Sequence, residues 1–196
     1  MQDPKSTYSR YRIFYNKKDA ARFIGHLDLQ GLFSKALRRA RLPVAYSQGF
    51  NPHQLLSIAM PLSMGFSGTN ELFEVFFTKQ IKVNEIIKKL NEQLPAGIEI
   101  ISVQETPNTG KAAAGILHGA VYEITFPCAV KCEAPNELEE AVFAISQVNE
   151  NTLQATLAAG SKKNLKPQKF VQALIESQNL NIDETQIKYE RKGLLL

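Results

Sequence analysis

The order in which helix-like and strand-like apolar patterns alternate constrains this fold most. Residues 28–41 repeat apolar side chains every three or four positions, which predicts an amphipathic helix with Asp28 as its N-cap and an end before Pro43. The patterns run as strand, helix, strand, strand, helix and strand, over residues 8–15, 28–41, 54–62, 71–78, 83–94 and 98–105. That order is the split β-α-β arrangement of ferredoxin-like domains, so we expect an α+β fold.

A second set of patterns follows residues 106–119, a small, polar, glycine-containing segment that indicates a linker or long loop. Strands are expected at 121–126, 152–157 and 187–195, and helices at 135–147 and 167–178. The sequence therefore predicts two ferredoxin-like halves in tandem, a first domain at 1–105 and a less regular α/β half at 120–196.

The net charge of +4 hides an uneven distribution. Residues 1–55 carry ten Lys or Arg and three Asp or Glu, a net +7, whereas residues 56–196 carry thirteen and sixteen, a net −3. Six of the seven arginines lie in the first segment. Such a distribution indicates a local basic surface that suits a polyanion such as nucleic acid. The alternative is a solvated helix face whose counter-charges lie elsewhere.

A turn-rich loop, residues 46–53 with the sequence YSQGFNPH, follows the basic end of the first helix. Its aromatic Phe50 stands between turn-forming residues and is either a plug into the core or a platform on which a base stacks. In a nucleic-acid site, arginines contact phosphate, aromatics stack, and amide and imidazole groups orient the ligand. The residues predicted for these roles are Arg38, Arg39, Arg41, Tyr46, Phe50, Asn51 and His53. A purely structural Ω-loop is the alternative.

Two histidines, His26 and His53, are the candidates for acid–base catalysis, because imidazole exchanges protons near neutral pH. The alternative for His26 is a backbone hydrogen bond that holds the turn into the first helix. A second basic cluster precedes the helix expected at 167–178 and is either a phosphate site or a solvated loop. Its members are Lys162, Lys163, Lys166 and Lys169.

The two cysteines, Cys128 and Cys132, have C-x3-C spacing. Zinc would need two further ligands, and a C-x3-C-x2-C cluster site would need a third cysteine where this chain has Pro135. The sequence has no glycine-rich phosphate or dinucleotide motif, so we expect no metal and no cofactor. With no export signal and no long apolar run, we expect reduced thiols, a cytoplasmic location and no membrane contact.

Four segments together resemble one bacterial family: RFIGHLDL, ALRRARLPVAYSQGFNPH, SIAMPLSMG and YERKGLLL. The chain resembles the radical-SAM-linked proteins, a domain of unknown function that is fused to a radical SAM protein or encoded beside one. The resemblance implies an accessory protein without an iron–sulfur cluster of its own, a radical SAM protein as partner, and RNA or a ribosomal component as a target. The family pattern continues N-P-H-P-[KR], whereas Gln54 and Leu55 follow His53 here, so one positive charge is missing.

The leading hypothesis is a non-catalytic RNA-binding or substrate-presenting protein that works with a radical SAM enzyme. A second hypothesis is a metal-independent endoribonuclease in which His26 or His53 acts as general acid or base. A third is a protein–protein scaffold whose basic surface binds an acidic partner.

Overall fold

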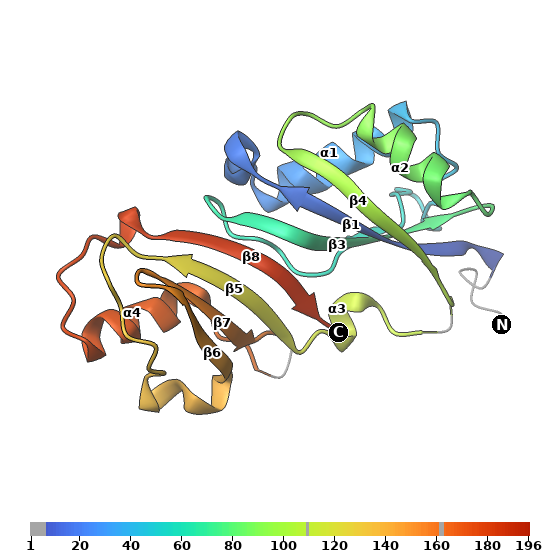
Figure 1. Ribbon diagram of the computed structural model, residues 1–196. Helices are drawn as coiled ribbons and strands as arrows, with labels where there is room; N and C mark the ends of the chain where they lie inside the picture. Colours follow the sequence, from blue (N-terminus) through green and yellow to red (C-terminus); the bar gives the residue numbers. More distant parts are fainter. Residues whose placement is uncertain (1–6, 109, 161–162) are drawn as a thin grey trace.

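The computed structural model describes residues 7–108, 110–160 and 163–196, which fold as α+β around one mixed sheet (Figure 1). Seven of the eight strands of these residues follow the order β4-β1-β3-β8-β5-β7-β6, and the eighth, β2, pairs with β3 off this path. The first half contains β1 (Ser9–Lys17), α1 (His26–Arg39), β2 (Leu56–Ile58), β3 (Ser67–Phe77), α2 (Val83–Asn91) and β4 (Ile98–Thr106). The second contains α3 (Ala113–Ile116), β5 (Gly119–Thr125), β6 (Val142–Asn149), β7 (Thr152–Ala158), α4 (Pro167–Ser177) and β8 (Lys188–Leu195). Short 3-10 helices are η2 (Asp19–Phe23), η3 (Asn136–Ala141) and η4 (Glu184–Gln186).

In the first half, α1 and α2 pack on the same face of the sheet. Alternate side chains of β1 are buried there, and Tyr15 meets Phe33 of α1 and Phe73 of β3 in an aromatic cluster. The strands pair antiparallel in the order β4-β1-β3-β2. The predicted elements of this half all form near their expected positions, because strong apolar periodicity coincides with a core that needs it.

The start of α1 differs from the prediction. The helix begins at His26 with Gly25 as its N-cap, so Asp28 lies in the first turn and caps nothing. Its carboxylate still lies at the positive end of the helix dipole, where a negative charge is favourable.

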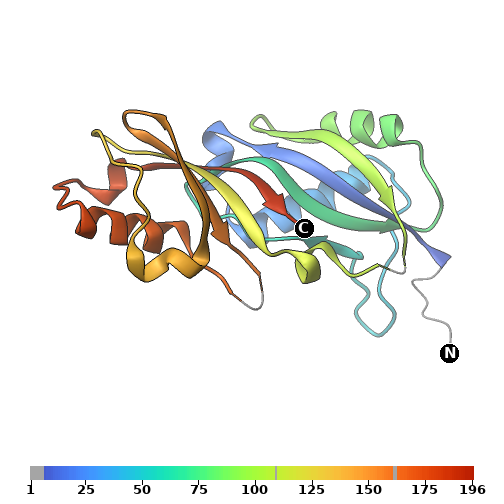
Figure 2. The same cartoon turned by 60° about the horizontal axis from the view of Figure 1, so that its bottom comes forward.

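In the second half, the strands pair antiparallel in the order β8-β5-β7-β6, and α4 lies beside them (Figure 2). The apolar side chains of α4 are buried in the core of this half. The helix predicted at 135–147 is wrong. A short 3-10 helix occupies Asn136–Ala141, and β6 follows at Val142–Asn149, paired with β7. Val142, Phe143 and Ile145 favour extended backbone, and the unpaired edge of β7 supplies their hydrogen bonds.

The two halves share one sheet through a short parallel pairing of β3 with β8, at Ser67 with Glu190 and Gly68 with Arg191. The predicted α+β class is confirmed. The finer prediction of two tandem ferredoxin-like halves, with boundaries at 105 and 120, stays a prediction. Within the segment expected to be a linker or long loop, α3 forms and Ala113 is completely buried.

A buried ion pair lies at this junction. The seventh arginine, Arg191, donates to both carboxylate oxygens of Glu71, at 2.7 and 2.5 Å, and both side chains are at most 1% exposed. Arg191 also donates to the backbone oxygens of Met60 and Pro61, at 2.8 and 3.3 Å. The pair therefore connects β3, β8 and the loop before β3. A Cβ at Gly68 would lie 2.7 Å from the Glu71 side chain, so this site needs glycine.

Candidate functional site

The 46–53 loop is the tip of a hydrogen-bonded hairpin. Leu55 N donates to Ala45 O at 2.8 Å and Ser47 N donates to His53 O at 2.8 Å, so backbone bonds fix both sides of its stem. Gly49 adopts a φ of +120°, which only glycine reaches without strain. The stem runs along the end of β3, where Val44 bridges to Phe77. A firm stem thus carries a tip that projects from the body of the molecule (Figure 2).

The tip is solvent-exposed. Phe50 has a relative exposure of 105%, and Tyr46, Asn51 and His53 are exposed as well. Phe50 is therefore not a core plug, which was one of its two interpretations. Exposing an aromatic ring to water is unfavourable in free energy. Stacking on a flat ligand would remove the ring from water and recover part of that free energy.

His53 is held by Ser47. The Ser47 hydroxyl oxygen accepts the backbone N–H of His53 at 3.0 Å and lies 2.8 Å from Nδ1 of the same residue. The tautomer of the ring decides which of the two groups donates in this contact, and in either case Nε2 remains for an outside group.

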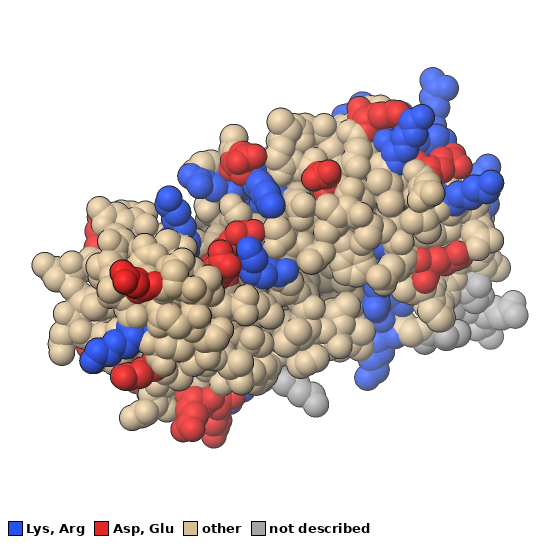
Figure 3. Space-filling view, in the orientation of Figure 1, with Lys and Arg blue, Asp and Glu red and all other residues tan. Residues whose placement is uncertain are grey.

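The predicted arginines are all exposed: Arg38 and Arg39 lie in the last turn of α1, and Arg41 lies just beyond the C-cap residue. Arg39 is already engaged, because it donates to the backbone oxygen of Gln93 at 2.6 Å. Figure 3 shows basic and acidic side chains interleaved around α2, so the surface there is mixed rather than uniformly basic. Whether the three arginines contact phosphate stays a prediction.

Part of the +7 net charge of residues 1–55 is carried by buried side chains, so the basic surface is smaller than the sequence predicts. Arg10 is 3% exposed, Lys17 is 0% exposed and Arg12 is largely buried. Lys17 donates to the backbone oxygens of Arg22 and Ile24, and burial lowers its pKa. Part of the charge excess thus stabilises the fold and is not available to a ligand.

A cavity of about 400 Å³, which we call the loop pocket, lies beside the stem of the 46–53 loop. Its walls include Arg10, His53, Gln54, Glu74, Phe76 and Ala112. They come from β1, the loop stem, β3 and the segment before α3. This volume is within the range of small-ligand sites, about 300–1,000 Å³.

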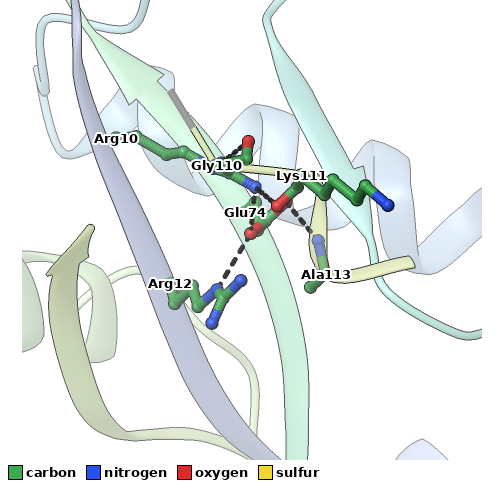
Figure 4. Close-up of polar contacts among 6 residues, drawn as sticks. All are labelled: Arg10, Arg12, Glu74, Gly110, Lys111 and Ala113. Carbon is green, nitrogen blue, oxygen red and sulfur yellow. Dashed lines mark hydrogen bonds and ion pairs between the residues drawn. The ribbon is translucent and has the colours of Figure 1, made fainter. Parts of the chain in front are cut away.

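Glu74 organises one wall of the loop pocket (Figure 4). Its carboxylate accepts from Arg10 at 2.6 Å, from Arg12 at 3.0 Å and from the backbone N–H of Ala113 at 3.0 Å. Arg10 also donates to the backbone oxygens of Gly110 and Lys111, at 2.8 and 2.9 Å. These contacts fix the segment before α3 against β1 and β3, so this wall is held firmly in place.

Nε of Arg10 and Oε1 of Gln54 belong to residues that line the loop pocket, and both atoms are buried without a hydrogen bond to another described residue. The other end of the Gln54 amide donates to the hydroxyl of Tyr46 at 3.3 Å. A buried donor or acceptor without a partner costs roughly 1–3 kcal/mol.

A protein-family model matches residues 10–193 of the chain. The family is DUF2344, described as an uncharacterised protein conserved in bacteria. The chain belongs to this family. No curated protein matches it. The DUF2344 match spans both halves of the sheet and both buried ion pairs, Arg10 with Glu74 and Glu71 with Arg191.

His26 is not brought together with His53. It is the first residue of α1, whereas the 46–53 loop follows the other end of this 14-residue helix, about 20 Å away along its axis. Nδ1 of His26 is buried and has no partner among the described residues. The alternative for His26, a backbone hydrogen bond that holds the turn, therefore does not involve Nδ1.

The second basic cluster lies in the other half of the DUF2344 fold. Lys166 is the N-cap of α4, Lys169 is exposed, and Lys163 pairs with Glu140 at 2.8 Å. Lys162 lies outside the described residues. The cluster is thus separate from the 46–53 loop.

Cys128 and Cys132 are free, half-buried thiols. Within the described ranges, no three His, Cys, Asp or Glu side chains gather as a metal ion would require. Nor does any helix there combine the length and apolar character needed to cross a bilayer.

Several residues of the site were missed by sequence reasoning: Arg10, Gln54, Glu74 and Phe76. A signal for one of them was present. Glu74 interrupts the apolar run LFEVFF and Glu71 directly precedes it, and a carboxylate in a buried strand requires a cationic partner. Gln54 gave no such signal, because its burial depends on how the loop stem lies on β3.

Proposed function

We propose that this DUF2344 protein is a non-catalytic, RNA-binding or substrate-presenting accessory protein that acts with a radical SAM protein in the cytoplasm. The observation that carries the proposal is the fully exposed Phe50 on a hydrogen-bonded stem. A rigid, exposed aromatic ring stacks on unpaired bases with little loss of conformational freedom. The radical SAM partner rests on the resemblance of residues 22–29, 36–53, 57–65 and 189–196.

The charge of the surface around the loop supports a polyanionic ligand. Arg38 and Arg41 are exposed at the end of α1 that leads into the 46–53 loop. Neither forms an ion pair with another described residue. Phosphate contacts by such residues provide affinity without base specificity.

We also propose that the chain is a tandem of two ferredoxin-like units. The sheet order β4-β1-β3-β2 of the first half recurs as β8-β5-β7-β6 in the second, with all neighbours antiparallel. The 3-10 helix η3 then stands where the first helix of the second unit would be. In this arrangement the 46–53 loop is an insertion before the second strand of the first unit.

The direct test is equilibrium binding of a labelled single-stranded RNA across a salt series. Phe50→Ala should weaken binding by about 1–3 kcal/mol, the value of one base stacked on an aromatic ring. Phe143→Ala is the matched control, because Phe143 is 51% exposed on β6 in the other half. Equal affinities of wild type and Phe50→Ala would remove the loop from the interface.

The arginines are tested by charge reversal. Arg38→Glu, Arg39→Glu and Arg41→Glu together should abolish binding at moderate salt. In the wild type these contacts should contribute about 2 to the slope of log K against log salt, since each phosphate contributes about 0.7 for single strands. The control reverses Lys18, Lys131 and Lys188, three exposed lysines elsewhere on the molecule. Binding that does not depend on salt, or its loss in the control alone, would contradict the proposal.

A further inference from the structure

We infer that two copies of this chain form a dimer through β6, with the two β6 strands antiparallel about a two-fold axis. The inference does not depend on the proposed function. The strands β4 and β6 are the two ends of the sheet order (Figure 1). A further open side belongs to β2, which has only three residues. The two ends of the sheet differ in how their outward backbone groups are covered, and this difference leads to the inference.

The β4 end of the sheet is closed. The side chain of Asn91 in α2 bonds both backbone groups of Ile100: its Nδ2 donates to Ile100 O at 3.0 Å, and its Oδ1 accepts from Ile100 N at 2.8 Å. The strand also carries Glu99 and Glu105, and charged side chains on an edge strand discourage another strand from pairing with it. Two-fold pairing of β4 would place glutamates of the two copies near one another, which is unfavourable.

The β6 end of the sheet is open. The strand has the sequence VFAISQVN, which contains no charged residue and no proline. Six of its eight residues are exposed, including the apolar Phe143 at 51% and Val148 at 50%. It pairs with β7 on one side, and none of the described strands pairs with its other side. Between two irregularities, residues 144–147 keep a regular register with β7, so their outward backbone groups form a regular row.

A second copy of β6 is the occupant that fits this edge. A row of outward N–H and C=O groups is matched by another extended strand, which presents the same groups at the same spacing. The occupant should also be uncharged along the contact, because β6 offers no charge with which to pair one. Another β6 meets both requirements, and two-fold pairing uses the open edge of each copy. Since the β4 end is closed, association should stop at the dimer.

The first experiment is sedimentation equilibrium of the full chain over a concentration series, which should show a monomer in equilibrium with a dimer. The double variant Ala144→Lys with Ser146→Lys adds two positive charges to each β6 at exposed positions. In the dimer these lysines face those of the other copy, so the dissociation constant should rise more than about tenfold. The matched control, Ile101→Lys with Gln104→Lys, adds the same charge at exposed positions of β4 and should leave the dissociation constant unchanged.

The second experiment locates the contact in the wild-type protein and needs no variant. Backbone hydrogen exchange is measured at protein concentrations below and above the dissociation constant. Outward amides within residues 144–147 should exchange more slowly at the higher concentration, because the other copy supplies their acceptors. The amides of β4 should exchange at the same rate at both concentrations.

Support requires a dimer that the β6 lysines weaken and the β4 lysines do not, together with slower exchange in β6. A chain that stays monomeric throughout the series overturns the inference. So does a dimer whose β6 amides exchange at the same rate at both concentrations, because its contact then lies elsewhere. Assembly that grows beyond the dimer overturns it as well. RNA takes no part in these measurements, so their failure would leave the proposed function standing.

Discussion

Replacement of Arg191 by methionine should destabilise the protein by about 3–5 kcal/mol. The guanidinium is 1% exposed and its partner Glu71 is 0% exposed, so the variant leaves a buried carboxylate without its hydrogen-bonded ion-pair partner, and only the more distant Lys17 ammonium still interacts with it. Methionine keeps much of the apolar stem of arginine but carries no donor. The cost therefore arises from charge and not from lost volume.

The double variant Glu71→Leu with Arg191→Met separates the charge from the other contacts. Both the single and the double variant lose the bonds to the backbone oxygens of Met60 and Pro61. Only the single variant keeps a buried carboxylate that has lost its ion-pair partner. The double variant should therefore be more stable than the single one by about 3 kcal/mol, because replacement of a whole buried pair by apolar groups is often nearly neutral.

Urea unfolding followed by circular dichroism measures both changes. For a chain of this size, 3–5 kcal/mol corresponds to a fall in thermal midpoint of about 6–20 °C. Lys192→Met is the control, because Lys192 is half-exposed and its pairs with Glu123 and Glu190 should contribute less than about 1 kcal/mol. The reasoning is refuted if Arg191→Met costs no more than this control, or if the double variant is no more stable than the single.

Three further predictions follow from the structure. Burial raises the pKa of Tyr122 and raises that of Tyr189 to about 12, whereas tyrosines of the unfolded chain ionise near pH 10. Above pH 10 the folded state therefore keeps protons that the unfolded state loses. The free energy of unfolding, measured with urea, should consequently fall between about pH 10 and 12. Gly68→Ala should cost about 1–3 kcal/mol in the same assay, because its Cβ would collide with a locked carboxylate, whereas Gly193→Ala, which meets no atom within 4 Å, should not show this collision cost. His53→Ala should weaken RNA binding modestly, and neither it nor the wild type should cleave RNA without metal; on a gel, metal-independent cleavage by the wild type that is lost in the correctly folded variant would instead support the endoribonuclease.

The sequence predicted those elements whose apolar period is long and whose ends carry clear stop signals. The helix ending before Pro43 and the helix beginning at Pro167 are examples, and both form close to their expected bounds. The helix predicted after Pro135 was wrong because the acidic start of this segment resembles a helix N-terminus. Its pairing with β7 is a tertiary contact that no local sequence pattern reveals. Pairing of β3 with β8 is also non-local and was not foreseen.

For the candidate site, sequence reasoning found the side chains that face solvent and missed those that face inward. The exposure of Phe50 agrees with a turn-rich loop, since glycine, asparagine and proline keep such a tip out of the core. Arg10 was counted as part of a basic surface, although it alternates with the apolar side chains of β1 and is buried by the segment before α3. A strand pattern reveals which side chains share a face but not what covers that face.

The bond between Glu71 and Arg191 joins residues 120 positions apart in the sequence. A ribosome adds about 5–20 residues per second, so Glu71 is made about 6–24 seconds before its partner. During that interval β3 lacks β8, and the Glu71 carboxylate remains hydrated at an open strand edge. The nascent first half can thus assemble its aromatic core early, whereas the edge of β3 that pairs with β8 stays open until β8 leaves the ribosome. Ribosome-bound chains that stop before Arg191 should consequently be open to proteolysis at the loop before β3, the loop that Arg191 later holds.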